Sequence, residues 1–202
     1  MKVGISPESL TSPLSHFIPY LQEILSDTHS RAQAEAIAAW VGTDAGRFQA
    51  LLDVLFGDDP LLVQRAAWPL RVVGDARPEM LAPHWPTLID YLGAPVHVAV
   101  RRNVLALAAE RREPWPEALL GYLVDHCFRL LASPPEPPAV KVHAMTILLH
   151  ACRQEPGLKP ELQATIEAQM PMGSRGFVNR GRKVLRALAR ISEAGSPGAD
   201  VG

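Results

Sequence analysis

Apolar residues recur every three or four positions along most of the chain, which is the spacing of one face of an α-helix. This pattern predicts helices over residues 14–26, 29–42, 44–57, 60–76, 78–93, 95–110, 115–132, 137–153, 158–171 and 174–191. Strand signals are scarce, because the chain lacks alternating apolar and polar runs and has no Asn-Gly or Asp-Gly hairpin dipeptide. The sequence therefore predicts an all-α fold.

The two ends of the chain differ from the rest. Residues 1–13 are rich in Ser and Pro, and residues 192–202 hold one large apolar side chain, a valine. We expect both ends to be disordered. A chain of 202 residues is too short for two ordinary domains and a linker, so residues 14–191 are predicted to form a single domain.

Helix stops and starts follow one another at regular intervals. They fall at residues 57–60, 93–95, 133–135 and 173–174, where Gly or Ser stands beside Pro, Asp or Ser. The helices that follow can be aligned on Val63, Val100, Val140 and Val178, with steps of 37, 40 and 38 residues. The chain is therefore predicted to be an array of helical repeats.

Each aligned helix carries an apolar stripe with small residues at its middle. The position seven after each Val is Leu70, Leu107, Ile147 or Leu185, and the position three or four after it includes Ala66, Ala67, Val104, Ala144 or Gly181. Small side chains there allow a neighbouring helix to approach closely.

The repeats resemble those of the HEAT family, in which a leucine-rich first helix, an Asp-Pro turn and a second helix with Val-Arg and paired Ala form one unit. Residues 51–70 (LLDVLFGDDPLLVQRAAWPL) carry the resemblance best, and residues 79–107 come next. It covers about residues 44–191. It implies an α-α superhelix, a HEAT-like solenoid of about four helix pairs, with the N-terminal helices as an irregular cap.

Two features depart from the HEAT pattern. The second and third junctions lack the Asp of the first, and Pro69 lies inside its helix, where it removes a hydrogen-bond donor and is expected to kink the axis. Some repeats are therefore expected to be irregular.

The near-neutral composition conceals an uneven distribution of charge. The formal net charge is -1, which argues against a surface built entirely for nucleic acid or an anionic membrane. The second helices nevertheless hold 12 bases and one acid, Asp75, whereas the first helices hold three bases and eight acids if Asp44 is counted. The HEAT resemblance implies that second helices line a concave face, so this face is predicted to be basic.

A basic concave face would hold an anionic partner, either an acidic protein segment or nucleic acid. The alternative is that the bases pair within the fold, as when Asp58 or Asp59 holds Arg65. For residues 174–191 six bases without an acid favour binding. The predicted binding residues are Arg65, Arg101, Arg102, Lys141, Arg180, Arg182, Lys183 and Arg186.

One enzymatic alternative shares the predicted fold. Alkylpurine DNA glycosylases of HEAT-like type cradle DNA in a basic concave face, and such an enzyme would need cleft aromatics and a carboxylate that stabilises a cationic transition state. Trp40, Trp68, Trp85 and Trp115 supply aromatics, although tryptophans at helical spacing more often pack in a core. Because the second helices offer only Asp75 as a carboxylate, we assign no catalytic residue and favour a non-catalytic scaffold.

The sequence indicates no metal or cofactor. His143 and His150 share a helix face, but their spacing matches no zinc signature, and the chain has no Gly-rich phosphate loop. Cys127 and Cys152 lie in apolar helical runs and are expected to be reduced, buried thiols. With neither a signal peptide nor an apolar run long enough to cross a bilayer, the chain is expected to be cytoplasmic and away from the membrane.

Overall fold

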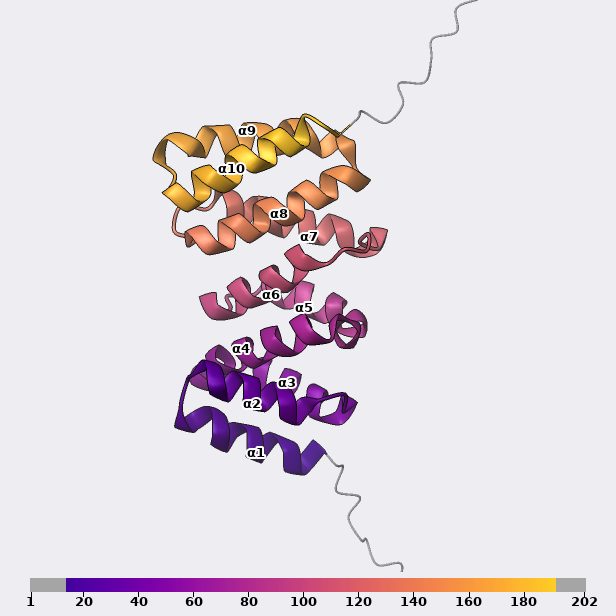
Figure 1. The fold of residues 1–202 in the computed structure, drawn as a ribbon, viewed down its shortest axis with the longest axis vertical. Coiled ribbons are helices and arrows are strands. Elements are labelled where there is room, and N and C mark those ends of the chain that lie inside the picture. Colours follow the sequence, from indigo (N-terminus) through magenta and orange to yellow (C-terminus); the bar gives the residue numbers. More distant parts are fainter. Residues whose placement is uncertain (1–13, 192–202) are drawn as a thin grey trace, which may run out of the picture. The chain divides into compact units, whose positions relative to one another are not determined.

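The structure is a computed structural model that describes residues 14–191; the predicted disordered ends, 1–13 and 192–202, lie outside the described residues. Within residues 14–191 the chain forms ten α-helices and three short 3₁₀ helices, and no strand (Figure 1). The fold is all-α, with the helices in stacked pairs as in a HEAT α-α solenoid. The helices form two compact units, divided between Met80 and Leu81.

The first unit consists of two helix pairs. In each pair the first helix is here called an A helix and the second a B helix. The A helices α1 and α3 pack against each other, as do the B helices α2 and α4, and α3 also packs against α4. The predicted N-terminal cap is thus stacked in the same way as the repeats. The bounds are α1 Leu14–Asp27, α2 Arg31–Val41, α3 Ala45–Leu55 and α4 Pro60–Ala76.

The second unit consists of three helix pairs with the same two layers. The A helices stack in the order α5, α7 and α9, and the B helices in the order α6, α8 and α10. The bounds are α5 Trp85–Leu92, α6 Val98–Glu110, α7 Glu117–Ala132, α8 Pro138–Gln154, α9 Lys159–Gln169 and α10 Arg175–Leu188, with 3₁₀ helices η1 Pro78–His84 before α5, η2 Pro156–Leu158 before α9 and η3 Met170–Met172 after it.

The predicted helices are confirmed, and their boundaries differ most where proline is dense. The predicted helix 78–93 divides into η1 and α5, because Pro83 has no N–H to donate and Pro86 fits only the first turn of a new helix. The predicted start of α6 at residue 95 is also wrong. That helix begins at Val98, where His97 Nδ1 accepts the N–H of Ala99 at 3.2 Å.

Short polar side chains define several helix starts. Ser30, Asp44, Asp59 and Ser174 each accept a backbone N–H two or three residues ahead, which satisfies donors that the first turn leaves free. Gly42, which follows α2, has a φ of 54°, a conformation that favours glycine. The sequence signals for starts and stops therefore act locally, as expected.

The positions that define the sequence repeat are also positions of the buried core. Val63, Val100 and Val140 are buried, and so are the residues seven positions later, Leu70, Leu107 and Ile147. In the last repeat the equivalent Val178 and Leu185 are partly exposed. The stripe is covered in the first three repeats and incompletely covered in the fourth.

Small residues bring neighbouring helices together, as the sequence predicts. Ala66, Ala144 and Gly181 are all buried. A Cβ atom at Gly181 would lie 2.9 Å from Cγ2 of Ile166 on α9, closer than real Cβ contacts. Pro69 is buried as well, and α4 runs through it from Pro60 to Ala76.

A reciprocal pair of hydrogen bonds ties the end of α8 to the segment before α7. The backbone N–H of Trp115 donates to Gln154 Oε1, and Gln154 Nε2 donates to the Trp115 carbonyl, both at 2.9 Å. The Trp115 ring is buried and packs edge-on against Trp85, with ring centroids 5.1 Å apart. One glutamine thus satisfies two backbone groups beside a buried ring.

Replacing Gln154 by Leu should destabilise the protein by about 1–3 kcal/mol, because both backbone groups of Trp115 lose their partner. Urea unfolding followed by circular dichroism measures the change. Gln163→Leu is the matched control, because Gln163 is exposed and bonds only Glu167 one turn away. Equal stabilities of the two variants would contradict the role given to Gln154.

Candidate binding surface

The predicted binding residues fall on four B helices in two units. Arg65 lies on α4 in the first unit. The other seven lie on α6, α8 and α10, which are adjacent B helices of the second unit (Figure 1). The second unit therefore brings together most of the predicted surface.

Arg65 serves the fold of the first unit. Its Nη1 donates to the carbonyl of Leu25, near the end of α1, at 2.6 Å. A cation at the end of a helix satisfies a carbonyl that has no helical donor. The pairing of Arg65 with Asp58 or Asp59 is wrong in detail, because Asp59 caps α4 by accepting the N–H groups of Leu61 and Leu62.

Arg101 and Lys141 bridge neighbouring repeats. Arg101 Nη2 lies 3.3 Å from Oε1 of Glu136, whose side chain is only 10% exposed. Lys141 Nζ donates to Gln169 Oε1 at 2.8 Å. Burial lowers the pKa of Lys141, and the nearby Glu136 partly offsets this. Arg101 and Lys141 therefore pair within the fold, which is the alternative to binding a partner.

Arg180 joins α10 to α8. Its guanidinium donates twice to the hydroxyl of Thr146, from Nε at 3.0 Å and from Nη2. Burial lowers the pKa of His150, one turn further along α8, and the nearby Arg153 and Arg180 lower it further. These groups form a polar, positively charged seam between α8 and α10.

The remaining four predicted residues are exposed. They are Arg102, Arg182, Lys183 and Arg186. The ion pairs among residues 16–191 involve other bases, and none of them includes these four. The structure thus divides the predicted set into four residues engaged within the fold and four that face solvent.

Helix α10 concentrates the exposed bases. Arg175, Asn179, Arg182 and Arg186 recur every three or four residues and so form one exposed stripe, while Phe177, Gly181, Val184 and Leu188 are buried on the opposite side. The helix contains no acid. We call this stripe, together with Lys183, the basic face of α10.

The four tryptophans pack against other aromatic side chains. Trp85 and Trp115 are buried against each other in the second unit, as described above. In the first unit Trp40 packs on Phe17 and Tyr20, and Trp68 packs on His29. Packing is also the more common role of tryptophans at helical spacing.

The histidines and cysteines give no metal centre within residues 16–191, where no group of three or more His, Cys, Asp or Glu side chains could hold an ion. Cys127 and Cys152 are free and buried, as predicted. Burial raises the pKa of both thiols, that of Cys152 to about 11, so both are protonated at neutral pH.

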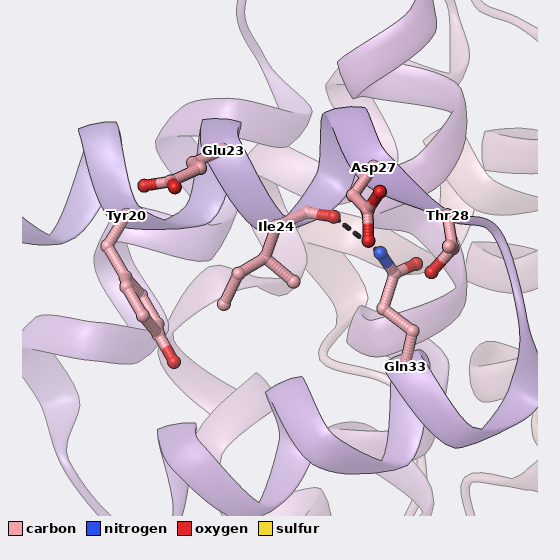
Figure 2. A pocket seen from close by; sticks show the side chains of 6 residues that line it. All are labelled: Tyr20, Glu23, Ile24, Asp27, Thr28 and Gln33. Carbon is pink, nitrogen blue, oxygen red and sulfur yellow. Dashed lines mark hydrogen bonds between the residues drawn. The ribbon is translucent and has the colours of Figure 1, made fainter.

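A pocket that the sequence does not predict lies between α1 and α2. It has a volume of about 380 Å³ and is lined by Tyr20, Glu23, Ile24, Asp27, Thr28 and Gln33 (Figure 2). Gln33 Nε2 donates to the Ile24 carbonyl at 2.5 Å and joins the two helices. Glu23 and Asp27 are exposed, and no ion pair of the described residues includes them. The sequence signal was the i, i+4 spacing of these two acids on the polar side of α1.

Stacked A and B helices define an α-helical repeat protein, and comparison with known families identifies the kind. The family model of the HEAT repeat domain matches residues 21–188. The chain therefore belongs to the HEAT repeat family, whose members typically serve as binding scaffolds. No curated protein and no solved structure gives a significant match. Among the described residues, no helix has the length and apolar character needed to span a membrane.

The lowered pKa of His150 predicts a pH effect on stability. Burial, Arg153 and Arg180 lower the pKa of His150 in the fold, whereas in the unfolded chain it takes up a proton below about pH 6.5. The unfolded state thus binds more protons as the pH falls below that value, and stability is lost. The fall in urea midpoint between about pH 7.5 and about pH 5.5 should be smaller in His150→Gln than in the wild type. An unchanged fall would contradict this assignment.

Proposed function

We propose that this HEAT repeat protein is a binding scaffold that holds an anionic partner on the B helices of its second unit. The observation that carries the proposal is the basic face of α10, on which the exposed bases have no acid on the same helix and no ion pair with any of the described residues. Arg102 on α6 and Arg153 on α8 are exposed bases of the same layer and extend the surface. The proposal involves no catalytic step, metal or cofactor.

Helix α10 is the last B helix of the described residues, and an outer face of mixed charges would be enough to keep it soluble. A face of one sign instead repels itself and attracts anions. Asn179 is the one polar residue of α10 that is not a base, and the exposed bases are Arg175, Arg182, Lys183 and Arg186. Arginine predominates, and its planar guanidinium can bind a carboxylate or a phosphate through two hydrogen bonds. These properties support anion binding over simple solvation.

The proposal narrows the set of residues expected to touch the partner. Arg65, Arg101, Lys141 and Arg180 have partners within the chain, so we assign them to positioning of the helices. Arg102, Arg182, Lys183 and Arg186 are proposed to contact the partner. An acidic protein segment and a nucleic-acid backbone both present the required anionic groups.

Neutralising the basic face should weaken binding of anions. Labelled DNA, RNA and an acidic peptide are titrated with the wild type and with Arg182→Gln/Lys183→Gln/Arg186→Gln, from about 50 mM to about 300 mM NaCl. We expect at least one of the three ligands to bind the wild type with a steep salt dependence. Loss of three cationic contacts should weaken that binding at least about tenfold, and the affinity of the variant should depend less steeply on the salt concentration.

The matched control is Arg31→Gln/Arg112→Gln/Arg129→Gln, which removes the same charge from exposed positions outside the basic face. It should bind nearly as well as the wild type. Glutamine favours helices, so circular dichroism should be unchanged in both variants. Failure of the wild type to bind any of the three ligands, or equal loss in both variants, would overturn the proposal.

A further inference from the structure

The side of α10 that carries Val178 and Leu185 resembles an unfinished repeat interface. These two residues occupy the positions that are buried in α4, α6 and α8, and they lie two turns apart, about 10 Å along the axis. They are partly exposed, and within residues 14–191 no further B helix follows to cover them. Apolar residues at this spacing can pack against an α-helix of a partner.

Charge surrounds this apolar pair. Arg175 and Arg182 lie three residues before Val178 and Leu185 respectively, and three-residue spacing places them on an adjoining part of the helix surface. Met172, just before α10, is 93% exposed. A nucleic-acid backbone would pair with the arginines but would leave Val178 and Leu185 without an apolar partner. An acidic helix that also carries apolar side chains would pair with the arginines and pack against Val178 and Leu185. The combination of charge and apolar surface therefore favours a protein partner.

The first unit carries a surface of the matching chemistry. On α1, Tyr20 is 42% exposed and its ring is held against Trp40, with centroids 4.9 Å apart. Ile24 lines the same pocket, and Glu23 and Asp27 stand at its wall (Figure 2). This pocket therefore combines an aromatic ring, an aliphatic side chain and two carboxylates without ion pairs among the described residues. Such a pocket suits an arginine side chain.

We propose that α10 of one copy of the chain docks on the α1–α2 pocket of a second copy. Arg175 and Arg182 pair with Glu23 and Asp27, while Val178 and Leu185 pack against Tyr20 and Ile24. This inference rests on the proposed function and names its anionic partner: the acidic surface of another copy. The contact uses different surfaces on the two copies, so each complex retains one free surface of each kind and assembly continues unless it closes into a ring.

A charge exchange tests the contact. Sedimentation velocity at about 50 mM NaCl should show the wild type associating above its 22.0 kDa monomer mass, and about 500 mM NaCl should weaken this association at least about tenfold. The variants Glu23→Arg/Asp27→Arg and Arg175→Glu/Arg182→Glu should each be monomeric alone, because like charges then meet. Mixed together they should associate again, because each supplies the charge that the other needs.

Arg112→Glu/Arg129→Glu is the control, because it changes charge on exposed residues outside both surfaces, and it should associate like the wild type. All these positions are exposed, and circular dichroism verifies that each variant is folded. A wild type that remains monomeric at about 50 mM NaCl, or a mixture of the two variants that remains monomeric, overturns the inference.

The outcome also separates this inference from the proposed function. Binding of labelled DNA, RNA or acidic peptide is measured for Glu23→Arg/Asp27→Arg, whose α10 is intact. Salt-dependent binding by this variant, with no self-association of the wild type, overturns the second-copy contact and leaves anion binding in place. If the variant binds none of the three ligands and the wild type does not self-associate, both the second-copy contact and the proposed function are overturned. If mixing the two charge-exchanged variants restores association, both are supported.

Discussion

Close packing of each B helix against its neighbouring helices is the constraint on which the rest of this structure depends. An isolated helix pair cannot bury its apolar faces, so each pair is stable only against its neighbours. Small buried residues, Ala66, Ala144 and Gly181, stand at the middle of the B helices, and a Cβ at Gly181 would lie 2.9 Å from Ile166 of the A helix α9, which leaves no room for a larger residue. Burial of the Val and Leu stripe follows from this proximity.

Long polar side chains then fix one repeat against the next. Arg65 reaches a carbonyl at the end of α1, Arg101 pairs with a nearly buried carboxylate, and Gln154 holds both backbone groups of Trp115. Removing one member of such a pair leaves a buried polar group without a partner, which costs more than the bond contributes. Several bases on the B helices therefore belong to the architecture. The basic face of α10 differs because, among the described residues, the side chains of Arg175, Arg182, Lys183 and Arg186 make no such contact.

Charge is distributed unevenly between the two units. Residues 14–80 hold nine acids and five bases, whereas residues 81–191 hold nine acids and 14 bases, giving formal charges of -4 and +5. A chain with net charge -1 thus carries an acidic unit and a basic unit. The acidic unit of one copy and the basic unit of another therefore attract each other over about a Debye length, 8–10 Å at moderate salt.

The sequence by itself determined the all-α class, the repeat register at Val63, Val100 and Val140, and the helix starts at residues 57–60 and 173–174. These features depend on helical periodicity and on contacts within one turn, which a linear sequence records. Only the tertiary structure decided which bases are free. Arg101 and Arg102 are neighbours in sequence, yet one pairs with Glu136 and the other faces solvent, because adjacent residues on a helix point about 100° apart. The pocket between α1 and α2 likewise depends on how two helices meet, which no local pattern specifies.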